Sequence, residues 1–131
     1  MTHLLKQVIL SAAFFLLFDG IYIYSTAGYF DKQINMVQGS TIRVNLLGTI
    51  ITYVFLLAGL NYFILSPNKS WKEAAILGLF VYGVYEYTNL SILKSWKWET
   101  TVMDTLWGSF LFGATTFLTQ DVLRRVNMFK K

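Results

Sequence analysis

The sequence contains no cysteine, a single histidine and a single proline. Without cysteine there can be no disulfide bond, thiolate nucleophile or thiolate metal ligand. The one histidine, His3, lies near the N-terminus, which argues against a histidine-based triad or zinc site, and we predict neither a metal nor a cofactor. The proline, Pro67, lies between two apolar runs, where the chain must turn.

Charged residues are also scarce. They make up 14% of the 131 residues, against roughly 25% in a soluble domain, while 55% of the residues are hydrophobic. The net charge of +4 comes from loop and tail residues rather than from a basic stripe interleaved with aromatic residues, so we predict no nucleic-acid partner. This composition indicates an integral membrane protein whose main partner is the lipid bilayer.

Four apolar runs are long enough to cross a hydrocarbon core, which takes about 20 residues. They cover about residues 4–28, 42–65, 71–93 and 100–118, with a polar connection at 29–41. The basic tail, residues 119–131, has the spacing of an amphipathic helix on a membrane surface. We therefore predict a single all-α domain, residues 1–131: a bundle of four antiparallel transmembrane helices with an amphipathic C-terminal tail, in which the first run is a retained helix rather than a cleaved signal peptide.

Four spans would place both termini on one side of the membrane. The side that holds the termini and the second connection would carry seven of the lysine and arginine residues, and the other side four. Because basic residues favour the cytoplasmic side, we predict a multipass protein with both termini in the cytoplasm.

Acids are the least expected residues in these runs, because an ionised side chain at the bilayer centre costs about 2.5–3.5 kcal/mol on insertion scales. Three of the runs carry one, and other polar residues share each acid's helical face or lie beside it. The resulting candidates for substrate binding or proton handling are Asp19, Tyr22, Tyr82, Tyr85, Glu86, Asn89, Asp104 and Trp107. The second run has a polar stripe without an acid, and its supporting candidates are Arg43, Asn45 and Thr49.

Counting depth at about 1.5 Å per residue places most of these side chains in the half of the membrane that faces away from the cytoplasm. The four stripes therefore predict a polar cavity open towards that face. Alternatively, the polar groups hold the bundle together, although interhelical hydrogen bonds in membranes average only about 0.6 kcal/mol. Arg43 either extends to the membrane interface or neutralises Asp104 or Glu86.

Three functions fit such a site. The leading hypothesis is transport of a small solute or a proton, because intramembrane carboxyl groups commonly line ion and proton pathways. Four helices enclose little volume, so such a pathway would form more readily between the subunits of a homo-oligomer. The second is a membrane enzyme that acts on a lipid or isoprenoid, with one carboxyl group as acid and another as base. The third is a non-catalytic membrane or virion component. The sequence does not decide whether the protein is an enzyme.

Two glycine pairs, Gly78 with Gly83 and Gly108 with Gly113, have a spacing that superficially suggests phosphate loops. No phosphate-binding pattern surrounds them, so we predict that they are points of close helix packing.

These motifs resemble those of a known family. The residues that carry the resemblance are Asp19 and Tyr22, the stretch from Tyr82 to Asn89, Trp96, and Asp104 with Trp107 and Gly108. They are similar to the motifs of small four-span membrane proteins grouped as domain of unknown function 2177, which implies the fold and the site but no reaction. The family more often has Asp at the position of Glu86 and Trp at the position of Tyr22.

Overall fold

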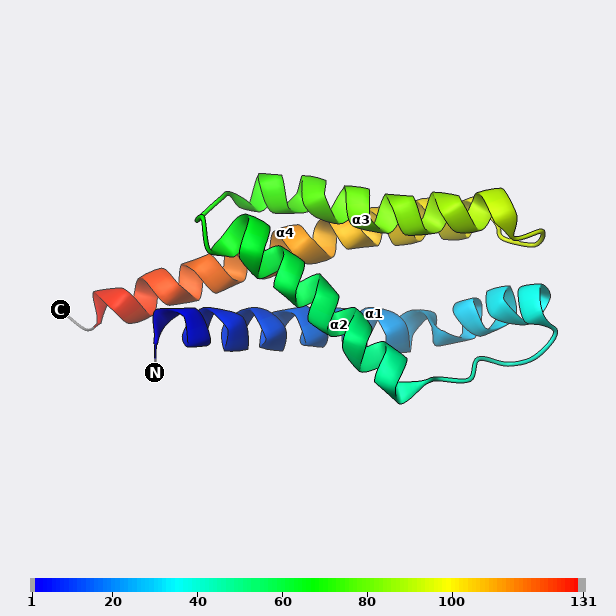
Figure 1. Cartoon of the computed structure of the whole chain (residues 1–131), viewed down its shortest axis with the longest axis horizontal. Coiled ribbons are helices and arrows are strands. Elements are labelled where there is room, and N and C mark those ends of the chain that lie inside the picture. Colours follow the sequence, from blue (N-terminus) through cyan, green and yellow to red (C-terminus); the bar gives the residue numbers. More distant parts are fainter. Residues whose placement is uncertain (1, 130–131) are drawn as a thin grey trace.

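The computed structural model describes residues 2–129 and is built of helices. In chain order these are α1 (His3–Gln38), α2 (Leu46–Leu60), a short π-helix η1 (Asn61–Leu65) that continues α2, α3 (Trp71–Ile92) and α4 (Trp98–Met128). Successive helices run in opposite directions, and α1 begins at the same end of the molecule at which α4 ends (Figure 1). The all-α prediction is confirmed.

Side-chain caps and a left-handed glycine set several helix boundaries. The Thr2 hydroxyl accepts a hydrogen bond from the Leu5 amide at 3.1 Å at the start of α1. Gly39 ends α1 with φ of 76°, a left-handed conformation that costs glycine little. Ser70 and Glu73 form a reciprocal capping box at the start of α3. The turn between α2 and α3 therefore falls at Pro67, as the sequence predicted.

Two helices extend further than the sequence suggested. The polar connection expected at residues 29–41 is shorter, because α1 continues to Gln38 and only residues 39–45 link it to α2. The spacing of the tail fitted either a helix on the membrane surface or the end of a helix fraying into water. In the structure the tail continues α4 to Met128, and Thr119 and Leu123 are buried against the rest of the protein. The last two residues of that predicted tail lie outside the described residues.

Among the described helices, α1 and the α2–η1 segment are long and apolar enough to cross a membrane. Each contains a stretch with a mean hydropathy of 1.8. The 36 residues of α1 give a length of about 54 Å at about 1.5 Å per residue, which exceeds a hydrocarbon core of about 30 Å. Part of α1 therefore extends beyond the core of any bilayer that it crosses.

Helices α3 and α4 pack side by side along most of their length (Figure 1). A Cβ atom added to Gly78 would lie 2.2 Å from the carbonyl oxygen of Gly108, and one added to Gly108 would lie 2.2 Å from the ring of Tyr82. The prediction of close packing is thus confirmed at these two positions. By contrast, α2 crosses α1 obliquely (Figure 1), and most of its side chains are exposed.

The distribution of polarity is inverted relative to a soluble protein, in which buried residues are mainly apolar. Many of the buried side chains are polar, and they come from α1, η1, α3 and α4. Large apolar side chains such as Leu17, Phe55 and Phe80 lie exposed on the outside. Lipid can cover such a surface, whereas polar groups in lipid must find partners inside the protein. This arrangement therefore supports membrane localisation.

Candidate functional site

The three acids predicted from the sequence line one open cavity of about 540 Å³. The cavity lies between the C-terminal halves of α1 and α3, in the part of the molecule furthest from the chain ends. Asp19 reaches it from α1, Glu86 from α3 and Asp104 from α4. The other lining residues are Tyr22, Ile23, Thr26, Ala27, Phe30, Ile34, Gln38, Ile42, Arg43, Tyr82, Tyr85 and Trp96.

Asp19 connects three helices. Its carboxyl group accepts a hydrogen bond from the Tyr53 hydroxyl of α2 and another from the Trp107 indole of α4, the latter at 3.0 Å. Only 7% of Asp19 is exposed. An acid in this position is stabilised by donors that its own helix cannot supply, so its pairing depends on the tertiary fold.

Asp104 of α4 accepts a hydrogen bond from a residue of α1. The Tyr22 hydroxyl donates to Asp104 Oδ1 at 3.1 Å. The Tyr22 ring also stacks on the Trp107 ring, with centroids 4.3 Å apart and planes 4° from parallel. Because Trp107 in turn donates to Asp19, the acids of α1 and α4 share one connected set of aromatic donors. Asp19 and Tyr22 share a face of α1, and Asp104 and Trp107 share a face of α4, but each acid is bound by the aromatic residue of the other helix.

Glu86 is the most deeply buried of the three acids, with 1% of its surface exposed. Its Oε2 accepts a hydrogen bond of 2.9 Å from the indole of Trp96, which lies in the connection after α3. Its Oε1 is buried and has no hydrogen-bond partner among the described residues. The carboxyl group of Asp104 lies within hydrogen-bonding reach of Glu86 and repels it when both are ionised. The two carboxyl groups can therefore pair with each other only by sharing a proton.

The remaining predicted residues divide into two groups. Tyr82 and Tyr85 line the cavity from α3, and the exposed Arg43 lines it from the α1–α2 connection without forming an ion pair with any described carboxylate. Asn89 is half-buried and is not part of the cavity lining.

The polar stripe of α2 does not join the site. Asn45 caps α2 by accepting a hydrogen bond of 3.0 Å from the Gly48 amide, and the Thr49 hydroxyl donates to the Asn45 carbonyl at 3.0 Å. The sequence predicted four converging stripes, three of them with an acid. The three acids line the cavity, whereas Asn45 and Thr49 do not, and α2 contributes the Tyr53 donor to Asp19.

Within residues 2–129, no three acids or histidines come close enough to hold a metal ion. Asp19 uses its oxygens for two hydrogen bonds, whereas Glu86 and Asp104 form a closer pair. The acids therefore act as hydrogen-bond acceptors in this arrangement.

A network at the end of α1 was not predicted. The Gln33 amide donates to the Ser95 carbonyl at 2.8 Å and accepts from the Lys97 amide at 3.1 Å and from the Thr100 hydroxyl at 2.7 Å. Gln33 thereby fixes the α3–α4 connection on either side of Trp96, the donor to Glu86. The sequence contained a pattern that indicates the position of Gln33, because residues 19, 22, 26, 29 and 33 are polar and spaced alternately by three and four along α1.

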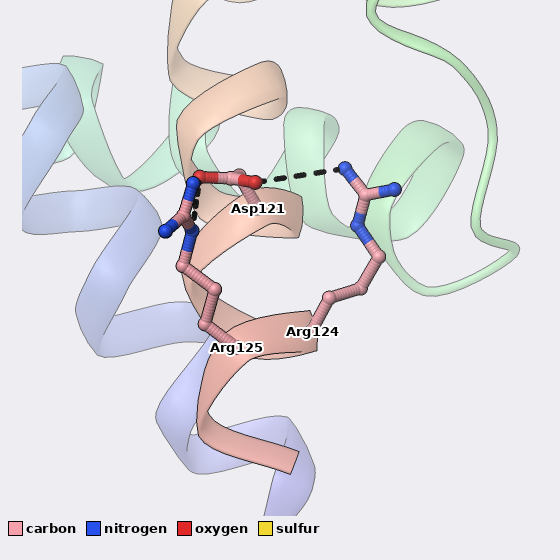
Figure 2. Close-up of polar contacts among 3 residues, drawn as sticks. All are labelled: Asp121, Arg124 and Arg125. Carbon is pink, nitrogen blue, oxygen red and sulfur yellow. Dashed lines mark hydrogen bonds and ion pairs between the residues drawn. The ribbon is translucent and has the colours of Figure 1, made fainter. Parts of the chain in front are cut away.

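The opposite half of the molecule has its own polar contacts. The buried Gln7 amide donates to Asn61 Oδ1 at 3.0 Å, and the Asn61 amide donates to Ser11 at 3.1 Å, which joins α1 to the π-helix. Near the end of α4, Asp121 forms ion pairs with Arg124 at 3.9 Å and Arg125 at 3.0 Å (Figure 2). Asp121 is thus an acid on the same helix as Asp104 but outside the acidic cavity.

Comparison with known proteins gives one result. A family model described as "Predicted membrane protein (DUF2177)" matches residues 4–120 of the chain. No curated protein and no solved structure is detectably similar to it.

Proposed function

Because the chain belongs to this family of predicted membrane proteins, DUF2177, we propose that all four helices cross the membrane with both termini in the cytoplasm. Their alternating direction supports this arrangement, as does the apolar outer surface of α3 and α4, on which Phe80 and Phe110 are exposed. The excess of lysine and arginine near the chain ends and at the α2–α3 turn supports the orientation. The acidic cavity then lies in the half of the membrane away from the cytoplasm.

Within this topology the cavity supports proton-linked transport of a small solute. The observation that carries this proposal is Glu86: it is 1% exposed, it lines the cavity, and its Oε1 has no hydrogen-bond partner among the described residues. Burying two neighbouring carboxyl groups at membrane depth is costly, so a pair that can share a proton is better explained by proton or ligand binding than by helix packing.

The chemistry follows from the pair of acids. Glu86 and Asp104 repel each other when both are ionised, and the repulsion is strong where water is scarce. A proton or a positively charged solute relieves that repulsion, so each competes for the same place. The site can load and release a proton without the solute, so protein-dependent proton flux is expected under a pH gradient alone. A cationic solute changes that flux by competing for the same carboxyl groups.

The test measures proton flux in proteoliposomes with a pH gradient and a pH-sensitive dye inside. We expect Glu86→Gln to reduce the protein-dependent flux at least tenfold, because the amide keeps the shape of the side chain but cannot carry the proton. Asp121→Asn is the matched control, since Asp121 lies outside the cavity, and it should leave the flux unchanged. A flux that is the same in wild type, Glu86→Gln and empty liposomes would refute transport.

One observation favours a second function. Apolar side chains of α1, among them Ile23 and Phe30, line the cavity together with the acids. A lipid chain could lie against them while its head group meets a carboxyl pair that acts as acid and base. Lipid profiles of cells that express wild type or Glu86→Gln distinguish the two functions: an enzyme would change the abundance of particular lipids without requiring a pH gradient.

A further inference from the structure

We propose that the solute of the acidic cavity is an organic cation with an apolar body. This inference rests on the proposed function and specifies its substrate class. Three features of the cavity support it: an excess of carboxyl groups with one oxygen unpaired, aromatic side chains around them, and an apolar strip that leads away from them along α1.

The charge balance of the lining favours a cation. Asp19, Glu86 and Asp104 oppose a single cationic side chain, that of Arg43, which is exposed at the edge. Two of these acids already have aromatic donors within the protein, Asp19 from Tyr53 and Trp107 and Asp104 from Tyr22. The buried Oε1 of Glu86 has no N–H or O–H donor among the described residues. Its carboxyl group can pair with that of Asp104 only through a shared proton, and a cationic head group can take the place of that proton.

Aromatic side chains make an organic cation a better ligand than a metal ion. Tyr22, Tyr82, Tyr85 and Trp96 all line the cavity beside the acids. The face of an aromatic ring attracts ammonium groups, and the attraction is stronger when the cation is poorly hydrated, as alkylammonium ions are. A small inorganic ion would lose its water without gaining the oxygen cage that hard cations require.

We expect the body of the ligand to be apolar because the face of α1 that lines the cavity carries apolar side chains. Ile23, Ala27, Phe30 and Ile34 line the cavity at successive spacings of four, three and four residues, so they form a continuous strip. At about 1.5 Å per residue this strip is about 16 Å long. Asp19 lies one turn before the strip on α1, and Asp104 is bound by the neighbouring Tyr22. A charged head can therefore meet these two acids while an apolar body follows α1.

The experiment uses the full chain in lipid nanodiscs and isothermal titration calorimetry. The probe is phenyltrimethylammonium, and the control compound is its neutral isostere tert-butylbenzene, in which carbon replaces the charged nitrogen. We expect saturable binding of the cation only, weakened at least tenfold by Asp104→Asn and by Glu86→Gln. Asp121→Asn removes the same charge from α4 outside the cavity and should not change the affinity. Trimethylalkylammonium ions of increasing chain length should bind up to about fourfold more tightly per added methylene.

Several results would overturn the inference: no saturable binding of the cation, equal binding of the neutral isostere, or affinity unaffected by the cavity variants. If Asp104→Asn does not fold, Glu86→Asp, which keeps the charge, should retain binding that Glu86→Gln loses. The transport proposal and the substrate-class proposal can be refuted independently. Proton flux that depends on Glu86 without cation binding would support transport and refute the organic cation as substrate. Cation binding without proton flux would support the cation as a ligand and refute transport.

Discussion

At the scale of single residues, the site depends on aromatic donors that reach buried carboxyl groups. Tyr22, Tyr53, Trp96 and Trp107 each donate one hydrogen bond to an acid on another segment of the chain. Asp19 has two such donors, so the loss of either leaves it partly satisfied. Glu86 and Asp104 each have one, and the second oxygen of Glu86 has no donor among the described residues. Because Glu86 is also the most deeply buried of the three acids, it is the most sensitive to a single substitution.

Trp96→Phe tests this sensitivity. The substitution keeps most of the ring but removes the one N–H that donates to Glu86 among the described residues, so a buried carboxyl group loses its donor. Leaving a buried acceptor unsatisfied costs about 1–3 kcal/mol, and we expect the free energy of unfolding to fall by that amount. Reversible unfolding in mixed micelles gives the measurement.

Trp98→Phe is the control for this substitution. Trp98 lies two residues further along the chain, and 67% of it is exposed, so its replacement should change the free energy of unfolding by less than about 0.5 kcal/mol. Equal losses in both variants would show that the Trp96 hydrogen bond contributes little and that ring packing dominates.

At the scale of the helices, the contact between α3 and α4 places Glu86 beside Asp104. The backbone of α4 approaches α3 so closely at Gly108 and Gly78 that neither position has room for a side chain. Small residues allow such close contact between membrane helices, where packing replaces the hydrophobic effect as the source of stability. The two glycines therefore set the helix separation on which the pair of acids depends.

Gly108→Ala tests this contact. The new Cβ would lie 2.2 Å from the ring of the packed Tyr82, so the helices must separate. Overpacking of this kind costs about 1–3 kcal/mol, and we expect proton flux to fall as well because Glu86 and Asp104 move apart. Gly83→Ala is the matched control on the partner helix, where the new Cβ would lie 3.6 Å from Thr105, an ordinary contact. Thermal unfolding of both variants in detergent gives the comparison, and equal stability would contradict the close-packing account.

At the scale of the whole molecule, the question is how many helices cross the membrane. Helix α1 and the α2–η1 segment have the required length and hydropathy, whereas α3 and α4 bury polar side chains against the rest of the protein, among them Glu86 and Asp104. If all four cross, the connection before α2 and the connection before α4 lie on the same outer side. If only α1 and α2 cross, the second of these connections stays in the cytoplasm.

Cysteine labelling distinguishes these topologies, and the chain has no native cysteine to remove. Thr41→Cys lies in the exposed α1–α2 connection, Lys94→Cys in the α3–α4 connection and Asn127→Cys near the end of α4. We expect a membrane-impermeant maleimide to label the first two in intact cells and the third only after lysis. Protection of Lys94→Cys in intact cells would indicate two spans, and labelling of Asn127→Cys would reverse the orientation.

Much of the protein could be predicted from local patterns, because helical periodicity and polarity act over a few residues. The apolar runs predicted the helices, the acids within them predicted part of the cavity lining, and the glycines predicted close helix packing without naming the partner helix. The continuation of α1 to Gln38 follows from the same periodicity, since Tyr29 and Gln33 extend the polar face of Asp19. The sequence by itself therefore determined which polar residues lie within apolar helices and which helix faces they share.

Only the tertiary structure decided which partner each polar group has. The polar residues of the α2 stripe form hydrogen bonds within their own helix, where Asn45 caps the first turn. Tyr53 of the same helix instead donates a hydrogen bond to Asp19 of α1. Trp96 lies in the connection between α3 and α4, where its sequence position does not indicate a partner. It reaches Glu86 because Gln33 fixes the chain on either side of it. These pairings depend on how closely and at what angle the helices cross, which is set by contacts between residues far apart in the sequence. Local spacing carries no information about such contacts, so it located the acids but could not show that Glu86 lies beside Asp104 and receives a single donor, Trp96, among the described residues.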